Sequence, residues 1–126
     1  ERVIRRLLKG GPLVLATGGG AVISKNTRSA IAKSGISIWL KAPIQLLLRR
    51  ASKRDNRPLL KSADPLAVLT RLLAERERYY AEADLVFEGR DAPYEVTVEE
   101  LLRLLARHLG VQYSGTGPVG ILENDR

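Results

Sequence analysis

The stretch PLVLATGGG, residues 12–20, decides the fold class of this chain. Residues 12–17 form a short, mostly apolar run bounded by two glycines before it and three after it, which predicts a strand buried on both faces of a parallel sheet. Three consecutive glycines follow this run: Gly18, Gly19 and Gly20. They contribute no side-chain packing and increase the conformational entropy of the unfolded chain, so they lower the stability of the fold. Bare backbone after a parallel strand lets a small ligand lie against N–H groups, and a tight turn is the alternative interpretation.

Helices and strands alternate along the rest of the chain. Periodicity and capping residues predict helices over residues 1–9, from 24 or 26 to 35, and over 44–54, 64–80 and 98–109, with strands over 36–41 and 85–88. The inner face of the third helix is expected to carry Ile44, Leu47, Leu48 and Ala51. This alternation indicates an α/β fold, a three-layer parallel sheet with helices on both faces. We expect one domain over residues 1–110 with a lid at about 54–64, then a tail or linker over 111–126.

Length and composition exclude several classes of protein. With 126 residues we expect one domain with a core rather than a multidomain enzyme. The chain has no Cys and a single His, which excludes disulfides, thiolate nucleophiles and metal sites built from Cys or several His. No apolar run reaches the ~18 residues of a membrane span. No secretory leader is recognisable, so we expect a cytoplasmic protein with no membrane partner.

Positive charge is concentrated in one segment. The net charge of +7 favours anionic partners such as phosphates, carboxylates or nucleic acid. Between Lys41 and Lys61, seven of the eight charged residues are basic, and a solvated helix face is the alternative explanation. One Trp, four Tyr and one Phe are too few for a base-stacking platform, so we expect no nucleic-acid partner.

The sequence contains one match to a nucleotide-binding glycine motif and no match to the P-loop motif. GTGPVG, residues 115–120, matches G-x-G-x-x-G, but no strand precedes it, no helix follows it and it contains Pro118. We therefore reject a dinucleotide site there. The 126 residues contain no G-x-x-x-x-G-K-[ST], so the chain as given has no phosphate-cradling P-loop.

Two arginines are candidates for binding anions. Arg57 lies in the predicted lid, where it could neutralise charge on a transferring phosphoryl group, or it is an ordinary exposed arginine. Arg76 shares a helical stripe with Leu73 and Tyr80, which predicts an inward-facing side chain that requires an anion. Two alternatives are together as plausible as anion binding: Arg76 pairs with an acid such as Glu82, or its extended side chain reaches solvent.

An ordered set of motifs points to one family. The motifs are LATGGGAV (15–22), IWLKAP (38–43), NRPLL (56–60) and ERERYYAEADLVFE (75–88). In this order and spacing they resemble shikimate kinase, over about residues 1–109. The resemblance implies a P-loop nucleoside-monophosphate-kinase-like fold in a cytoplasmic monomer. It also implies transfer of the γ-phosphoryl of ATP to the 3-hydroxyl of shikimate, with Mg²⁺, in aromatic amino acid biosynthesis.

The resemblance assigns roles to individual residues. For the acceptor, it implies that Gly18, Gly19 and Gly20 line the shikimate site, that Arg76 grips the carboxylate, and that Glu1 matches the acid of the family's F-R-x-x-E segment. For the nucleotide, it implies that Arg57 is the catalytic lid arginine at the ATP phosphates, that Arg50 stacks on adenine, and that Arg90 and Pro93 belong to the adenine-edge loop.

The chain also departs from the family pattern. The P-loop, its Lys and Ser/Thr, the substrate-binding Asp and the Arg of F-R-x-x-E are not among the 126 residues, and Arg78-Tyr79 stands in place of a common Pro-Leu. We expect a chain truncated at its N-terminus, with the magnesium ligands in the missing part and no metal ligand in this one. The alternative function is a non-catalytic ligand-sensing domain of a larger regulatory protein.

Overall fold

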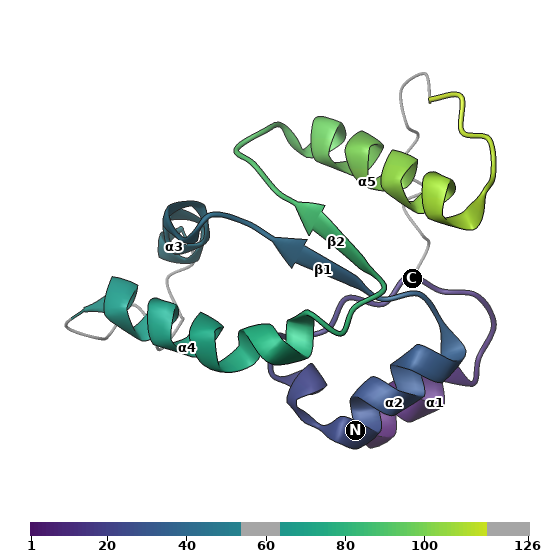
Figure 1. Ribbon diagram of the computed structural model, residues 1–126, viewed down its shortest axis with the longest axis horizontal. Coiled ribbons are helices and arrows are strands. Elements are labelled where there is room, and N and C mark those ends of the chain that lie inside the picture. The colour runs from purple at the N-terminus through teal and green to yellow at the C-terminus, as the bar shows by residue number, and fades with distance from the viewer. Residues whose placement is uncertain (54–63, 116–126) are drawn as a thin grey trace. The chain divides into compact units, whose positions relative to one another are not determined.

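The computed structural model describes residues 1–53 and 64–115 (Figure 1). The chain divides into two units, Glu1–Glu88 and Gly89–Arg126, which are described separately here. Most of the predicted lid, with Arg57, lies outside the described residues, as does nearly all of the GTGPVG motif. Within the described ranges, no helix combines the length and apolar character needed to cross a membrane.

The helices and strands follow the order expected from the sequence, with one exception. The first unit contains α1 (Arg2–Leu8), the short 3-10 helix η1 (Ala21–Ile23), α2 (Lys25–Ser34), β1 (Ile38–Lys41), α3 (Ile44–Ser52), α4 (Pro65–Tyr80) and β2 (Leu85–Glu88). The second unit contains α5 (Tyr94–Leu109). Five predicted helices and the strands at 36–41 and 85–88 are therefore confirmed to within a few residues.

Local capping explains where these helices begin and end. The Ser24 hydroxyl accepts a hydrogen bond from the Thr27 amide at 3.3 Å, and the Asp64 carboxylate accepts one from Ala67 at 3.1 Å. Both bonds satisfy amides of a first turn that have no partner within the helix. At the other end of the chain, Gly110 terminates α5 with φ 68°, a left-handed conformation that favours glycine.

The sheet described has two parallel strands, β1 and β2 (Figure 1). Ile38 pairs with Leu85, and the register continues to Lys41 opposite Glu88. A reciprocal clasp of hydrogen bonds precedes the first pair. The Asp84 carboxylate accepts from the Ser37 amide at 2.9 Å, while the Ser37 hydroxyl oxygen accepts from the Asp84 amide at 3.1 Å. These bonds fix the register at the start of both strands.

The prediction of a strand over residues 12–17 is wrong, because these residues form no strand in the described structure. Residues 13–18 have no regular secondary structure, and Val14 and Leu13 are 102% and 47% exposed. No backbone hydrogen bond to a described residue outside this segment involves residues 12–17. A strand exists only by pairing its backbone with another strand. Apolar, β-branched composition indicates that a segment suits a sheet, but it does not supply the pairing partner.

The buried apolar residues of the first unit come from α3 and α4, which pack against each other, and from Phe87 of β2. Leu46 and Ala51 of α3 and Leu69 of α4 are buried. The predicted inner face of α3 was correct for Ala51 but omitted Leu46, which is the most buried residue of that helix. Three consecutive leucines make the helical phase ambiguous from the sequence, and the contact with α4 decides it.

Candidate functional site

The three glycines form a turn against the C-terminal part of α4. The Gly18 carbonyl accepts from the Ala21 amide at 3.1 Å, so residues 18–20, called the glycine turn below, lead directly into η1. The Tyr80 hydroxyl donates to the Gly19 carbonyl at 3.1 Å. A Cβ atom on Gly19 would lie 2.6 Å from that hydroxyl, whereas one on Gly18 would meet nothing within 4 Å. Only glycine therefore fits at position 19 without displacing Tyr80.

Arg76 lies over the glycine turn. Its guanidinium nitrogens are 3.3 Å and 3.7 Å from where Cβ atoms of Gly19 and Gly20 would stand. The side chain is half-buried, in agreement with its predicted inward helical phase. No described residue accepts a hydrogen bond from it or forms an ion pair with it. The suggested pairing with Glu82 is wrong, because Glu82 instead pairs with Arg28 at 2.7 Å.

Tyr80 links the glycine turn to the sheet. Its ring packs on Trp39 of β1, with the centroids 5.8 Å apart and the rings tilted by 46°. The Lys41 ammonium lies 5.1 Å from the centroid of the same Trp39 ring. Tyr80 is thus held by its ring on one side and by its hydroxyl on the other, so the Gly19 carbonyl has a fixed partner.

Glu1 lies beside the start of α2. The Ser24 hydroxyl donates to the Glu1 carboxylate at 3.2 Å, and the Arg5 guanidinium is 4.0 Å from the same carboxylate. Ser24 directly follows η1, so Glu1 is near the segment that continues from the glycine turn. No contact between Glu1 and Arg76 is described, and the substrate role of Glu1 stays a prediction.

The residues predicted to bind the nucleotide are distributed over the first unit, the second unit and the residues outside the described ranges, and their roles stay predictions. Arg50 is exposed in the last turn of α3 in the first unit, and Arg57 lies outside the described residues. In the second unit, Arg90 pairs with Glu100, and Pro93 caps the start of α5. Within residues 1–53 and 64–115 there is no group of three or more His, Cys, Asp or Glu that could hold a metal ion.

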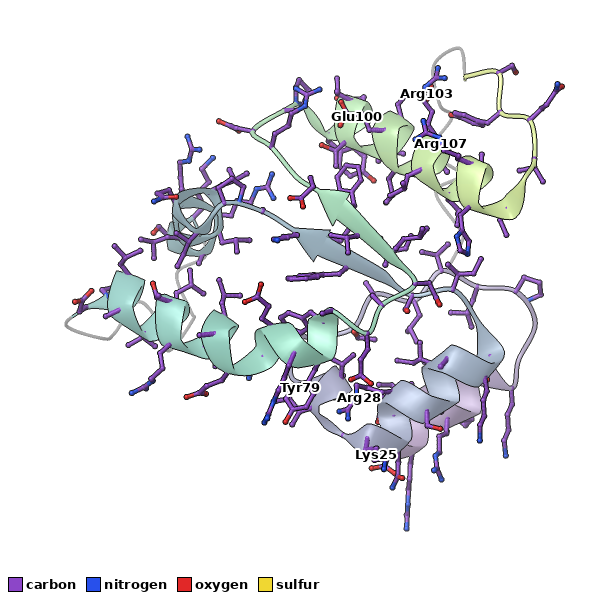
Figure 2. The ribbon with its side chains drawn as sticks, in the orientation of Figure 1. Lys25, Arg28, Tyr79, Glu100, Arg103 and Arg107 are labelled. Carbon is purple, nitrogen blue, oxygen red and sulfur yellow. The ribbon has the colours of Figure 1, made fainter. Side chains whose placement is uncertain are left out.

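Arg28 is a second arginine close to η1 and the end of α4, and the sequence did not predict its contacts. Arg28 of α2 approaches Tyr79 at the end of α4, and Figure 2 shows their side chains next to each other. The Arg28 guanidinium also donates to the carbonyls of Val22 and Ile23. A single sequence gives no signal for these contacts, since a polar residue inside a helix usually faces solvent.

The geometry of this site, formed by Arg76 and the glycine turn, suits a small organic anion such as a carboxylate. The guanidinium fork of Arg76 matches a carboxylate through two parallel hydrogen bonds. The absence of side chains at the glycine turn allows a small molecule to approach the backbone closely. One positive group without an acidic partner among the described residues, beside bare backbone, is an arrangement that favours binding an organic anion.

Comparison with known proteins identifies the family. Residues 1–106 match the protein-family model described as shikimate kinase. The shikimate kinase of Nitrobacter winogradskyi is 54% identical over 108 residues, covering 86% of this chain and 50% of that protein. That of Mesorhizobium japonicum is 52% identical over 120 residues, covering 94% of this chain and 59% of that protein. The chain thus spans about half the length of the curated relatives it matches.

Solved structures agree with this match. The shikimate kinase from Acinetobacter baumannii, solved in complex with shikimate, superposes with a TM-score of 0.76 at 31% identity, over 86% of this chain and 60% of that one. The enzyme from Bacteroides thetaiotaomicron, at 19% identity and a TM-score of 0.75, supports the fold alone. The predicted α/β fold class is confirmed. The chain belongs to the shikimate kinase family.

Proposed function

We propose that these 126 residues supply the acceptor-binding part of an enzyme that transfers the γ-phosphoryl of ATP to the 3-hydroxyl of shikimate. The single observation that carries the proposal is Arg76, which lies against Gly19 and Gly20 with no acidic partner among the described residues. Membership of the family and the shikimate complex of the Acinetobacter baumannii relative support shikimate as the ligand.

Each residue has a defined part in this proposal. Arg76 binds the carboxylate of shikimate, and the glycine turn lets the ring lie against the backbone. Arg57 neutralises the charge that develops on the transferring phosphoryl group, which is the main source of catalysis in phosphoryl transfer. The remaining nucleotide contacts are proposed for Arg50, Arg90 and Pro93.

Magnesium is proposed as a companion of ATP rather than as a metal held by the described residues. Mg²⁺ takes oxygen ligands in octahedral geometry, commonly one or two carboxylates together with substrate phosphates and waters. Among the described residues, no three or more His, Cys, Asp or Glu side chains come together in a group that could hold a metal ion by itself. No step of the proposal depends on a metal that these residues bind. Cytoplasmic location and a monomeric state stay predictions.

A chimera tests the proposal. The N-terminal part of a relative that carries G-x-x-x-x-G-K-[ST] is fused before residue 1, and formation of shikimate 3-phosphate from ATP and shikimate is measured. We expect turnover by the chimera and none by the 126-residue chain alone, which lacks an array of N–H groups and a Lys for the phosphates. A folded chimera that binds shikimate without turnover would favour the ligand-sensing alternative. One that neither binds nor phosphorylates shikimate would contradict both.

A further inference from the structure

Arg28 connects the segment after the glycine turn to the end of α4. Its guanidinium donates to the carbonyls of Val22 and Ile23 at 2.9 Å and 2.8 Å, both in η1. Its Nε atom lies 2.7 Å from the Glu82 carboxylate, and its guanidinium carbon lies 4.6 Å from the centroid of the Tyr79 ring. The side chain is only 18% exposed, so these protein groups replace most of its hydration.

This set of partners requires an arginine. A guanidinium is planar and presents its donors in fixed directions, so one side chain can reach two carbonyls, a carboxylate and an aromatic face together. The ammonium of a lysine has one compact centre and cannot span the same partners. Arg28 therefore fixes the orientation of η1 relative to Glu82, rather than only neutralising a charge.

The two elements joined by Arg28 are those that carry the candidate site. Gly20 immediately precedes η1, and Glu82 lies two residues beyond the end of α4, in which Arg76 is one turn before Tyr80. The Tyr80 hydroxyl holds the Gly19 carbonyl from the other side. Arg28 and Tyr80 thus connect the two elements at separate points, with the Arg76 guanidinium against the glycine turn.

We propose that Arg28 is a positioning residue of the acceptor site, which sets the distance between the backbone of the glycine turn and the guanidinium of Arg76. The proposal rests on the proposed function for its ligand. The Nε atom of Arg28 is buried without a hydrogen bond, but it forms an ion pair with Glu82, and the guanidinium donates to two carbonyls. Because its charge is paired with Glu82, Arg28 does not compete with Arg76 for the carboxylate of shikimate. Arg28 acts through its neighbours, and no contact of Arg28 with the ligand is required.

Steady-state kinetics of the chimera test this role. In Arg28→Lys and Arg28→Gln we expect the KM for shikimate to rise about tenfold, since misplacing binding groups by ~1 Å can cost up to about a hundredfold in rate. The KM for ATP should stay within about twofold. Arg71→Lys, an exposed arginine of α4 with no described partner, is the matched control and should change neither value. A role limited to stability would lower the melting temperature and leave the KM for shikimate unchanged.

A ligand-free readout separates this inference from the proposed function. In NMR spectra without ligand, the amide signals of the glycine turn and the Arg76 Nε–H signal should move in Arg28→Lys and not in Arg71→Lys. If these signals move but the wild-type chimera does not phosphorylate shikimate, the proposed function fails and the positioning role stands. If the wild type is active and folded Arg28→Lys keeps both the signals and the KM for shikimate, the inference is overturned. Should Arg28→Gln fail to fold, Arg28→Lys decides alone.

Discussion

Two arginines at one corner of the first unit have opposite surroundings. Arg28 is surrounded by two carbonyls, a carboxylate and an aromatic ring of its own chain. Arg76 lies beside the glycine turn and has no hydrogen-bond acceptor or ion-pair partner among the described residues. Neither the residue type nor its position in a helix distinguishes them in the sequence.

The surroundings of Arg28 are those of a structural cation, whereas the surroundings of Arg76 are those of a cation that can bind a ligand. Removing a guanidinium from water is costly unless hydrogen bonds and charge partners replace its hydration. At Arg28 the protein provides these partners, and the result is a rigid connection. At Arg76 the described residues leave the charge to solvent or a ligand, so binding an anion there requires no internal ion pair to break. The following predictions test this contrast, beginning with the largest expected effect.

Substitution of Arg76 should have the largest effect on ligand binding. In the chimera, Arg76→Ala should weaken shikimate binding by about 2–4 kcal/mol, or roughly 30- to 850-fold, as expected for losing one partner of a hydrogen-bonded charge pair. Arg76→Lys should not restore it, because lysine lacks the fork. Calorimetric titration with shikimate and with ATP measures both affinities, and ATP affinity should be unchanged. Unchanged shikimate affinity in a folded Arg76→Ala variant would show that Arg76 does not bind the carboxylate.

Adding one methyl group to the glycine turn should have the next largest effect. Gly19→Ala places a Cβ atom 2.6 Å from the Tyr80 hydroxyl, and Tyr80 is packed on Trp39, so either the turn or the ring must move. We expect a loss of about 1–3 kcal/mol in unfolding free energy, the usual cost of overpacking. Shikimate affinity should fall as well.

Gly18→Ala is the matched control for this substitution. A Cβ atom at position 18 meets no protein atom within 4 Å, so the stability of Gly18→Ala in urea should stay close to that of the wild type. Equal losses in the two variants would indicate that backbone freedom, not the approach of Tyr80, determines the glycine requirement.

Neutralising Glu82 should have a smaller effect on the unfolding free energy. Glu82→Gln removes the charge partner of Arg28 but leaves the two carbonyls that also hold it. The Glu82 side chain is 58% exposed and solvent screens the pair, so we expect a loss of about 0.5–1 kcal/mol in unfolding free energy. Urea denaturation measures it, with Glu75→Gln as the exposed control in α4. The difference between the two variants should shrink in high salt, and a salt-independent loss would contradict an electrostatic origin.

An effect on the unfolding free energy as small as that of Glu82→Gln is expected at Tyr79. Its ring lies between two guanidinium groups, 4.6 Å from Arg28 and 4.7 Å from Arg78. Tyr79→Leu should cost about 0.5–1 kcal/mol in unfolding free energy, the usual value of such contacts near a surface. Tyr79→Phe keeps the ring but loses the hydroxyl that accepts from Arg78, so it should cost less. If both variants lose the same stability, the hydroxyl rather than the ring provides the stabilisation.

Sequence reasoning succeeded where the determining interactions are local. Ser24 and Asp64 cap α2 and α4 through amides three residues away, and Gly110 ends α5 by its own backbone conformation. The inward phase of Arg76 followed from the helical repeat of α4. Each of these features depends on a few neighbouring residues, which the sequence displays directly.

The failures concern interactions between distant residues. Residues 12–17 have the composition of a strand, but no strand among the described residues pairs with them. Arg28 depends on Glu82, 54 positions later, and on carbonyls whose direction is set by the fold of η1. The family resemblance predicts roles for Arg76 and the glycine turn because their motifs are contiguous. It did not reveal Arg28, whose partners are dispersed along the chain.

The clasp between Ser37 and Asp84 has a consequence for how the chain is made. Its two residues are 47 positions apart, and β1 cannot pair with β2 until both have left the ribosome. At typical synthesis rates of about 5–20 residues per second, roughly 2–10 s separate the two events. During that interval the newly made β1, with Trp39 and Leu40, has no β2 edge to pair with. We expect this interval to be when the nascent chain is most exposed to chaperones and most prone to aggregation.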